Sequence, residues 1–310
     1  MERKIELGII GGGIAGLSAA VYAKRSGLES VIFESTAIGG QLLLMDSIDN
    51  YVGLGLGTKA HELVINLQST VSGLDLEVIN KTVNDVKVNK EGLSLNAEGL
   101  SYLTKGLIIA SGAKFKRLGV KGEGDFIGKG VSYCAVCDGF FFKGKDVAVI
   151  GGGNNAVEEA LYLSDIANKV FLIHRRDKLR ALNYLQKDLF SRKNIEILFN
   201  SQVKEVKGSE AVGSINIENT NTGQNKMLAL QGVFIAIGVG PSTDIFKDLI
   251  SRDEDGFIIT DENLKTNLEQ VWACGDCRKR PLRQLITAAS EGAIAAISAY
   301  RHIKGRYISS

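Results

Sequence analysis

The sequence predicts an α/β protein of two domains, each built on a parallel sheet, with one domain inserted into the other. The main observation is a repeat: an apolar strand, a glycine-rich turn and a small-residue helix occur twice, with Gly151 lying 140 residues after Gly11. A chain of 310 residues is also long enough for about two domains. Its composition, with 45% apolar and 23% charged residues, is ordinary for a globular protein.

The first copy of the repeat has the features of a dinucleotide-binding unit. The run Ile5–Ile10 predicts a buried strand, Gly11–Gly16 follows as G-x-G-x-x-G, and a helix runs to about Arg25. A second strand, Val31–Phe33, ends at Glu34. The glycines allow a pyrophosphate to approach the helix N-terminus, and the acid can accept hydrogen bonds from a ribose. This site therefore suits the adenosine of FAD.

The second copy keeps the backbone pattern and changes the charge. Val147–Ile150 predicts a strand, Gly151–Ala156 a turn leading into a helix, and Val170–Ile173 the closing strand. The position equivalent to Glu34 is occupied by His174. Together the two copies predict two Rossmann-like, three-layer ββα nucleotide-binding domains.

Basic residues follow the second closing strand. Arg175 and Arg176 come directly after His174, and Arg180 lies about one helical turn further on. Guanidinium groups can bind a 2′-phosphate bidentately, whereas a carboxylate would repel it. The second site is therefore expected to take NADPH rather than NADH. The alternative is that these arginines form only a solvated face.

A redox motif lies between the two copies. Cys134 and Cys137 are separated by two residues, which allows a disulfide in which one sulfur attacks a partner and the other resolves the mixed disulfide. Asp138 can exchange the proton that a leaving thiolate needs, and Phe140–Phe142 would form an apolar lip if exposed. The motif alone also allows half of a zinc site or a reduced structural pair.

The remaining pattern predicts the domain layout. Short strands are expected over Glu77–Leu103, apolar strands at Leu107–Ala113 and Val233–Gly238, and a C-terminal helix from about Leu282 to His302. We expect one discontinuous domain, 1–113 plus 244–310, to bind FAD. The inserted domain, 114–243, carries the cysteine pair and binds NADPH, and the two crossings form a double hinge.

Charge and hydropathy narrow the possible partners and location. The formal net charge of +2 gives no strong field for nucleic acid, and the three histidines are too scattered to suggest a metal cluster. The apolar run Leu7–Ala23 is interrupted by glycines, so we interpret it as strand, turn and helix rather than a signal peptide. With no run of transmembrane length, the expectation is a soluble cytoplasmic protein that binds neither membrane, nucleic acid nor metal.

With these motifs in order, the chain resembles the low-molecular-weight, bacterial-type thioredoxin reductases along essentially its full length. The resemblance rests on both glycine turns, Gly39–Leu42, Cys134–Phe141, His174–Arg176, and the Gly275-Asp276 and Arg283-Gln284 pairs. It implies a homodimeric, FAD- and NADPH-dependent enzyme that reduces thioredoxin. It also implies that one domain rotates against the other, so that NADPH first reduces the flavin and the cysteines then meet thioredoxin.

The resemblance also assigns residues. Cys137 matches the sulfur nearest the flavin, Cys134 the one that attacks the substrate, and Asp138 the general acid. Positions matching FAD contacts are Gly11, Gly13, Ile14, Ala15, Gly16, Glu34, Ser35, Gly40, Gln41, Asn50, Ala110, Gly275, Asp276, Arg283, Gln284 and Leu285. Those matching NADPH contacts are Gly151, Gly153, Asn154, Asn155, Ala156, Glu158, His174, Arg175, Arg176, Arg180, Ile237 and Gly238. Lys129, Phe140 and Phe141 match positions that dock thioredoxin.

Some positions depart from the family pattern. Asn155, Val52, Leu285 and Cys274 stand where the family usually has a small residue, proline, alanine and alanine, respectively. Other functions also stay open. The same scaffold could use NADH or reduced ferredoxin as donor, reduce another thioredoxin-like acceptor, or oxidise dithiols with oxygen. More remotely, Cys134, Cys137, Cys274 and Cys277 could form a four-cysteine zinc site.

Overall fold

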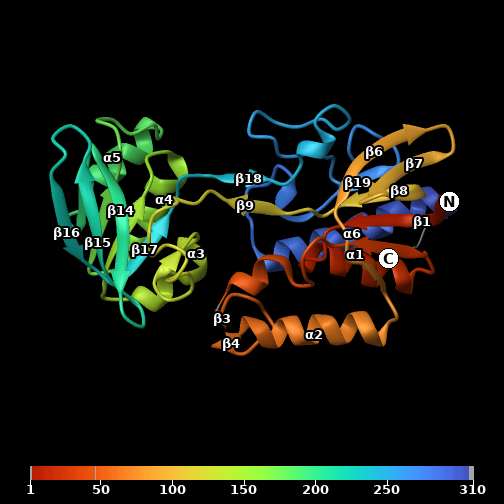
Figure 1. The fold of residues 1–310 in the computed structure, drawn as a ribbon, viewed down its shortest axis with the longest axis horizontal. Helices are drawn as coiled ribbons and strands as arrows, with labels where there is room; N and C mark the ends of the chain where they lie inside the picture. The colour runs from red at the N-terminus through yellow and green to blue at the C-terminus, as the bar shows by residue number, and fades with distance from the viewer. Residues whose placement is uncertain (1, 46, 307–310) are drawn as a thin grey trace. The chain divides into compact units, whose positions relative to one another are not determined.

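In a computed structural model of the protein, which describes residues 2–45 and 47–306, the chain folds as two compact units (Figure 1). The first unit comprises Met1–Lys114 and Gly240–Ser310, and the second comprises Phe115–Val239. The unit boundaries thus lie after residues 114 and 239, compared with the 113 and 243 expected from sequence. The chain crosses between the units along two paired strands, β9 (Ala113–Phe115) and β18 (Val239–Pro241).

A mixed sheet forms the centre of the first unit. Its parallel strands lie in the order β5-β2-β1-β8-β19, namely Glu77–Ile79, Ser30–Phe33, Arg3–Ile10, Leu100–Ile109 and Val271–Ala273. Strand β7 (Gly92–Ala97) pairs antiparallel with β8, and β6 (Val83–Asn89) pairs antiparallel with β7. The parallel strands are rich in Ile, Leu and Val because helices or other layers cover both of their faces.

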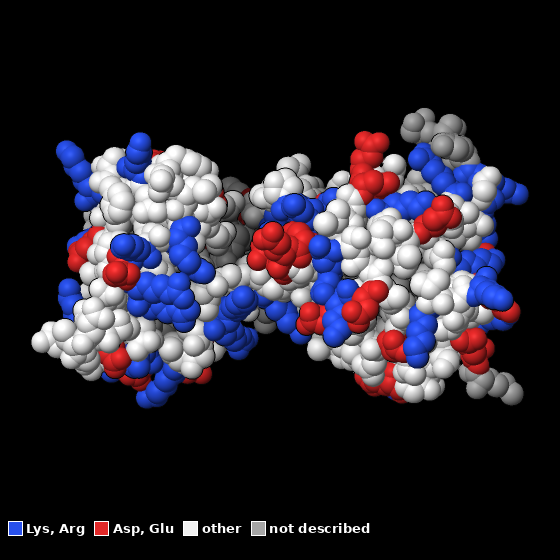
Figure 2. Space-filling view, turned by 90° about the horizontal axis from the view of Figure 1, so that it is seen from above, with Lys and Arg blue, Asp and Glu red and all other residues white. Residues whose placement is uncertain are grey.

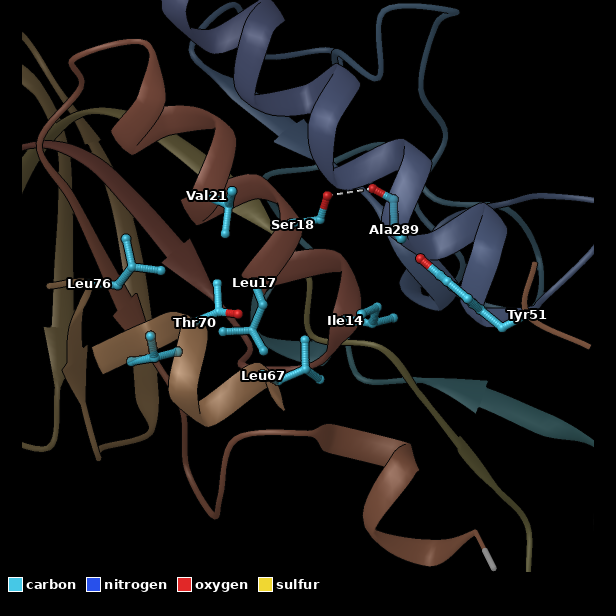
Figure 3. Close-up of a pocket in the computed structure, with 10 residues that line it drawn as sticks. Ile14, Leu17, Ser18, Val21, Tyr51, Leu67, Thr70, Leu76 and Ala289 are labelled. Atoms are coloured by element: carbon cyan, nitrogen blue, oxygen red, sulfur yellow. Dashed lines mark hydrogen bonds between the residues drawn. The ribbon is translucent and has the colours of Figure 1, made fainter. Parts of the chain in front are cut away.

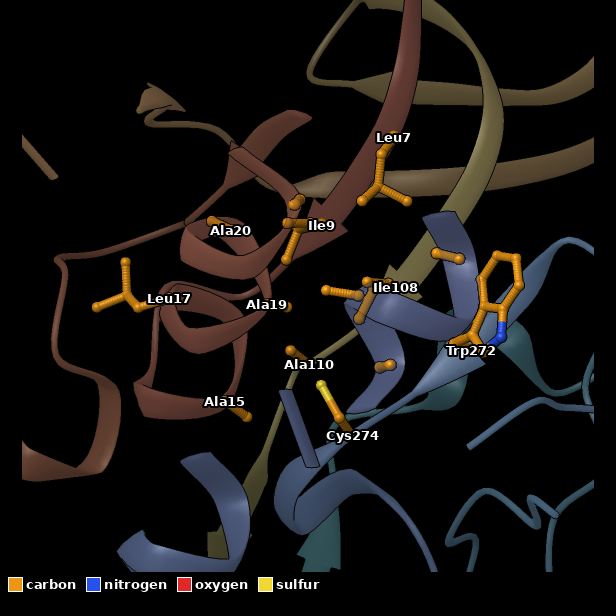
Figure 4. Packing of buried hydrophobic residues seen from close by; sticks show 14 of the residues in the cluster. Leu7, Ile9, Ala15, Leu17, Ala19, Ala20, Ile108, Ala110, Trp272 and Cys274 are labelled. Carbon is orange, nitrogen blue, oxygen red and sulfur yellow. The ribbon is translucent and has the colours of Figure 1, made fainter. Parts of the chain in front are cut away.

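Helices α1 (Ile14–Arg25) and α6 (Leu285–Lys304) pack against each other beside this sheet (Figure 4). Their contact is close because small residues line it. A Cβ atom added to Gly292 would lie 2.1 Å from the carbonyl oxygen of Ala15. The buried cluster beneath them includes Leu7, Ile9, Ile108 and Trp272 from the strands. These contacts hold the first glycine turn, which precedes α1, against the end of the sheet.

Two helical features of the first unit differ from the sequence expectation. Helix α6 begins at Leu285 rather than near Leu282, because Gln284 caps it in a reciprocal capping box with Thr287. Helix α2 (Ala60–Gly73) was not predicted. The shorter elements are η1 (Gly40–Leu44), β3 (Ser47–Ile48), β4 (Thr58–Lys59), η3 (Asp244–Phe246) and η4 (Gly275–Cys277).

The second unit repeats the parallel layer. Its strands lie in the order β13-β12-β11-β17-β10, namely Ile195–Leu198, Lys169–Ile173, Asp146–Ile150, Gly232–Ile235 and Val131–Ser132. A separate antiparallel sheet consists of β14 (Ser201–Gly208), β15 (Val212–Asn219) and β16 (Asn225–Ala229). The helices are α3 (Ala135–Asp138), η2 (Gly139–Phe142), α4 (Asn154–Ser164) and α5 (Asn183–Ser191).

The predicted 140-residue repeat is confirmed element by element. The first strand ends at Ile10 and at Ile150, the helix begins at Ile14 and at Asn154, and the second strand ends at Phe33 and at Ile173. The five parallel strands correspond in order, β5-β2-β1-β8-β19 to β13-β12-β11-β17-β10. The α/β class with two Rossmann-like domains is therefore correct.

The surface carries charges of both signs. On the face shown in Figure 2, lysine and arginine side chains are interspersed with aspartate and glutamate. In the part of the chain that the structure describes, none of the helices combines the length and the apolar character needed to cross a bilayer.

The α1–α6 contact gives a first testable prediction. Replacing Gly292 with Ala places a methyl group 2.1 Å from a backbone oxygen, which requires the two helices to separate. We expect the free energy of unfolding of the first unit to fall by about 2 kcal/mol or more. Urea unfolding monitored by circular dichroism measures this. The control is Gly73→Ala at the end of α2, where an added Cβ meets no atom within 4 Å. Equal stability of the two variants would contradict the close packing.

Candidate functional site

The first glycine turn brings the N-terminus of α1 to the end of the sheet. Gly11 has φ +110°, and a Cβ atom there would lie 2.3 Å from the carbonyl oxygen of Ala110. A Cβ on Gly16 would lie 1.9 Å from the carbonyl oxygen of Gly11. Gly13, by contrast, caps α1 without a side chain and faces open space, with Gly40 Cα the nearest atom to its added Cβ at 3.9 Å. The turn is therefore tight on the protein side and open on the ligand side.

Glu34 fixes this turn from the end of β2. Its buried carboxylate accepts hydrogen bonds from the backbone N–H of Gly12 at 2.6 Å and from the N–H and hydroxyl of Thr36 at 2.8 and 3.0 Å. Each carboxylate oxygen has two lone pairs, so acceptor capacity remains for a ribose hydroxyl. Ser35 follows on the surface, and Ile14 and Ala15 begin α1.

A second group of predicted residues meets near the start of α6. The side chain of Gln41 donates to Asp276 at 3.4 Å and to the carbonyl oxygen of Ala113 at 3.0 Å. Asn50 donates to the side chain of Gln284 at 3.0 Å. The fold thus joins the segments around residues 41–50 and 276–284, which the sequence separates by more than 200 residues. Gly275 and Leu285 flank this group, and Gly275 has φ +75°.

Several buried polar atoms in the first unit have no hydrogen-bond partner among the described residues. They include Ser111 Oγ, Asp276 Oδ1 and Arg283 Nε. The guanidinium of Arg283 lies over the ring of Phe257, 4.0 Å from its centroid. Burial raises the pKa of Asp276, and the charges of Arg280 and Arg283 partly offset this rise. Such orphaned atoms beside an open glycine turn fit a large polar ligand that would supply their partners.

The second glycine turn repeats the tight contact. A Cβ atom on Gly151 would lie 2.4 Å from the carbonyl oxygen of Ala236, and one on Gly153 would meet no atom within 4 Å. Asn154 accepts a hydrogen bond from the N–H of Leu182 at 2.9 Å, and the N–H of Arg180 donates to the carbonyl of Gly152 at 2.7 Å. The loop after β12 is therefore fastened to the turn.

His174 packs against the glycine turn of this site and does not contribute a positive charge. Its ring is buried against Gly152, where an added Cβ would lie 2.2 Å from the imidazole, and its Nε2 is 3.0 Å from the carbonyl oxygen of Lys178. Burial lowers its pKa, and the charges of Arg180 and Arg176 lower it further. The ring is therefore neutral at pH 7, and basic charge at this end of the site comes from the arginines.

Arg175, Arg176 and Arg180 are exposed, and within residues 2–45 and 47–306 no acidic side chain forms an ion pair with them. Their guanidinium groups are available to an anionic ligand. The other predicted residues of this site lie around the turn. Asn155, Ala156 and Glu158 belong to the first half of α4, and Ile237 and Gly238 follow β17.

The redox motif forms a disulfide on a short helix of the second unit. Cys134 and Cys137 are bonded to each other, with their Cα atoms 5.3 Å apart. Cys134 caps α3, and its Sγ accepts a hydrogen bond from the backbone N–H of Cys137 at 3.2 Å. The hydroxyl of Ser132 donates to Asp138 at 2.6 Å and accepts from the N–H of Cys134 at 3.1 Å. Ser132, which was not assigned a role from sequence, thus links the acid to the cysteine segment.

The predicted apolar lip is formed by two of the three phenylalanines. Phe140 and Phe141 are 69% and 42% exposed, respectively, and Lys129 is exposed as well. Phe142 is instead buried against Phe234, with ring centroids 5.2 Å apart. Val136, between the two cysteines, is 51% exposed and extends the apolar surface. The sequence feature that could have identified Val136 as part of this surface was its position between the two cysteines.

An apolar pocket of about 210 Å³ lies elsewhere in the first unit, between α1, α2 and α6 (Figure 3). Two of its polar groups are already used: the hydroxyl of Ser18 donates to the carbonyl of Ala289 at 2.6 Å, and that of Thr70 to the carbonyl of Asn66 at 2.9 Å. Most of its other lining side chains are apolar, which does not suit a nucleotide. It is lined by Ile14, Leu17, Ser18, Val21, Tyr51, Leu67, Thr70, Val71, Leu76 and Ala289.

Comparison with known proteins identifies the family. A family model described as pyridine nucleotide-disulphide oxidoreductase matches residues 6–292. The chain belongs to this family. It is 38% identical to a thioredoxin reductase of Peptoclostridium acidaminophilum, with 99% of both chains covered. The solved thioredoxin reductase of Streptococcus pyogenes is 40% identical, covers 99% of this chain and 100% of its own, and has a TM-score of 0.94. That of Giardia duodenalis is 35% identical, covers 98% and 100%, and has a TM-score of 0.93.

Pyridine nucleotide-disulphide oxidoreductases of this kind use FAD and NADPH. The residues present fit both groups. The first unit offers an open helix N-terminus and unpartnered buried polar atoms, and the second offers a like turn with exposed guanidinium groups. Family membership also argues against the four-cysteine zinc alternative. Cys134 and Cys137 are joined as a disulfide, which leaves no thiolate on either for a metal.

Cys274 and Cys277 are buried and reduced. The Sγ of Cys277 donates to the carbonyl oxygens of Cys274 and Ile109 at 3.3 and 3.4 Å. Burial raises the pKa of Cys277 to about 11, so it is a thiol at neutral pH. Both residues serve as small packing groups at the end of β19.

Glu34 gives the second prediction. Replacing it with Ala removes the acceptor for Gly12 and Thr36 and the carboxylate beside this turn, so we expect the dissociation constant for FAD to rise at least about 10-fold. Flavin absorbance per mole of purified protein, and titration of apoprotein with FAD, measure this. The exposed Glu254→Ala is the control. Unchanged FAD affinity in Glu34→Ala would show that FAD does not use this turn.

Proposed function

We propose that this chain catalyses the reduction of thioredoxin by NADPH, through FAD in the first unit and the Cys134–Cys137 disulfide in the second. The observation that carries the proposal is the environment of the disulfide. Cys134 is partly exposed, its sulfur accepts a backbone N–H, and a carboxylate and an apolar surface lie beside it. The names of the relatives support thioredoxin as the substrate class.

FAD is assigned to the first unit. The N–H groups of the first turn of α1 point to open space at Gly13 and would bind the pyrophosphate. Glu34 would accept from the ribose, and Gln41, Asp276, Arg283 and Gln284 would contact the rest of the cofactor. When bound, FAD supplies the two-electron chemistry between NADPH and the disulfide.

NADPH is assigned to the second unit. Gly153 leaves the N-terminus of α4 open to the pyrophosphate, as Gly13 does for α1. Arg175, Arg176 and Arg180 would bind the 2′-phosphate. The neutral ring of His174 supports the turn without adding a charge that would distinguish the two nucleotides.

The thiol chemistry follows from the two sulfur positions. In the reduced enzyme, the N–H of Cys137 stabilises a thiolate on Cys134, which makes Cys134 the attacking sulfur. It attacks one sulfur of the substrate disulfide, and the second sulfur leaves as a thiolate that takes a proton from Asp138. Cys137 then attacks Cys134, which re-forms the enzyme disulfide and releases the substrate's other sulfur as a thiol. Each turnover moves two electrons to the substrate.

Substrate docking is assigned to Val136, Phe140, Phe141 and Lys129. Three exposed apolar side chains beside a reactive sulfur form a surface that a protein can cover and from which water is then excluded. Lys129 adds one positive charge. We further propose that the enzyme is a homodimer and acts in the cytoplasm, as the resemblance implies. Light scattering of the purified holoenzyme tests the first of these.

Anaerobic titration of the flavin tests the donor. NADPH is expected to bleach the flavin at stoichiometric concentration, whereas NADH does so only in large excess. Bleaching by reduced ferredoxin but by neither nucleotide would establish the alternative donor. Thioredoxin and other thioredoxin-like proteins, added to the reduced enzyme, then identify the acceptor. Reoxidation by oxygen alone, with no protein acceptor, would favour the dithiol oxidase.

The third prediction separates the two half-reactions. Cys137→Ser cannot form the enzyme disulfide, so thioredoxin reduction is expected to fall by at least about 1,000-fold, while NADPH still bleaches the flavin. Stopped-flow absorbance measures the flavin, and thioredoxin-dependent NADPH consumption measures the complete reaction. Simultaneous loss of flavin reduction would mean that the cysteine pair and the nucleotide site are not separate.

The fourth prediction concerns nucleotide choice. Replacing both Arg175 and Arg176 with Ala removes charge-assisted hydrogen bonds to the 2′-phosphate, so the KM for NADPH is expected to rise about 10- to 100-fold while that for NADH stays nearly constant. The matched control replaces two other exposed cations of this unit, Lys193 and Lys226. Equal losses for the two nucleotides would show that the arginines form only a solvated face.

A further inference from the structure

Glu159 lies on α4 between the two functional parts of the second unit. Its carboxylate accepts a hydrogen bond from Asn155, in the first turn of the same helix, at 3.3 Å. It also interacts with the backbone N–H of Ala135, the first residue of α3. That amide nitrogen is bonded directly to the carbonyl carbon of Cys134. The carboxylate therefore lies at the start of the short helix that Cys134 caps.

The side chain is poorly compensated for a buried acid. Its Oε2 atom is inaccessible to solvent and has no hydrogen-bond partner among the described residues. Helices α3 and α5 and strands β11 and β12 pack against α4, and no charged side chain on any of them contributes to the pKa of Glu159. The titratable residues of these elements are Cys134, Cys137 and Asp138 of the α3 segment, Tyr184, Lys187 and Asp188 of α5, Asp146 of β11 and Lys169 of β12, besides Glu158 and Tyr162 on α4 itself.

Burial without a counter-charge holds the pKa of Glu159 at about 7 while the cysteines are oxidised, with the Asn155 and Ala135 contacts limiting the rise. The acid therefore takes up a proton at a much higher pH than an exposed glutamate does. A disulfide carries no charge, but its reduction can place a thiolate on Cys134. A thiolate on Cys134 and an ionised carboxylate at the start of the same short helix repel each other, so each charge opposes formation of the other.

We propose that Glu159 and Cys134 share one negative charge, so that Glu159 binds a proton when Cys134 becomes a thiolate and releases it when that thiolate attacks the substrate disulfide. Glu159 is a positioning residue in this proposal, because it acts on the substrate only through the ionisation of Cys134. The inference rests on the proposed function in taking Cys134 as the attacking sulfur.

The proton and electron balance is complete. Bound FAD would supply the two electrons that break the S–S bond, taken as a hydride from NADPH. The proton of that hydride goes to the Cys137 sulfur, which becomes a thiol, Cys134 becomes a thiolate, and Glu159 takes a proton from water. When Cys134 attacks the substrate disulfide, its charge passes to the leaving sulfur and Glu159 returns its proton to water. The net reaction stays NADPH, one proton and a disulfide giving NADP⁺ and a dithiol.

The coupling is reciprocal, so the ionised carboxylate raises the pKa of Cys134 by as much as the thiolate raises that of Glu159. Below the raised pKa, Glu159 is neutral and the thiolate is favoured. As the pH rises through it, the new carboxylate charge opposes further thiolate formation. The ionisation of Cys134 is therefore expected to spread over a wider pH range than that of an isolated thiol.

The fifth prediction tests this coupling in Cys137→Ser holoenzyme, where Cys134 is a free thiol. The rate of Cys134 alkylation by iodoacetamide is measured between about pH 5 and 10, with the labelled residue identified by mass spectrometry, since reactive thiolate sets this rate. We expect the parent curve to be broader than a one-proton titration. Adding Glu159→Gln should give a one-proton curve and about 3- to 10-fold faster alkylation at pH 7.

Two controls make the outcome decisive. Glu210→Gln replaces an exposed acid of the same unit and should leave the curve unchanged. An unchanged curve in Glu159→Gln as well would overturn the proposal. If Glu159→Gln fails to retain flavin or fold, the shape of the parent curve decides, because a one-proton curve there excludes the coupling. The measurement needs no thioredoxin, so its failure is distinct from failure of the wild-type enzyme to reduce thioredoxin.

Discussion

The contact on which both units depend is the approach of a glycine turn to the end of the neighbouring strand. In the first unit a side chain on Gly11 would collide with the carbonyl of Ala110, and in the second a side chain on Gly151 would collide with that of Ala236. Only glycine permits this approach. Because of it, the N-termini of α1 and α4 lie beside the carboxyl ends of parallel strands, where their free N–H groups face outward to bind phosphate.

With that backbone held constant, we propose that the residue after the second strand sets which nucleotide the turn binds. Glu34 accepts from the N–H of Gly12, so it both braces its turn and supplies an acceptor for a ribose. His174 braces its turn by ring packing beneath Gly152 and stays neutral, which leaves Arg175 and Arg176 to set the charge. One fold thus serves two nucleotides through a change of side chain.

The sequence was sufficient for features that depend on local pattern. The strand, turn and helix units were predicted because glycines and apolar runs determine them directly. Helix α2 was not predicted, although Ala60, Val64, Leu67 and Val71 recur at helical spacing, because exposed apolar residues such as Ile65 interrupt the pattern and only Ala60 and Val64 of this helix are buried. Contacts such as Gln41 with Asp276 depend on how distant segments pack, and residue spacing does not encode them.

Glu159 was not singled out from sequence for the same reason, because its role depends on how distant segments pack. An acid on the first half of a helix is ordinary, and its significance comes only from what covers it. Helix α4 has two roles: its N-terminus forms the nucleotide turn, and its side supports α3. Asn155 and Glu159 lie one helical turn apart on α4, between its N-terminal glycine turn and its contact with α3. In the proposed assignment, an anion at either end of α4 changes the cost of charging Glu159, and this helix then links the proposed nucleotide turn to the proposed attacking thiol.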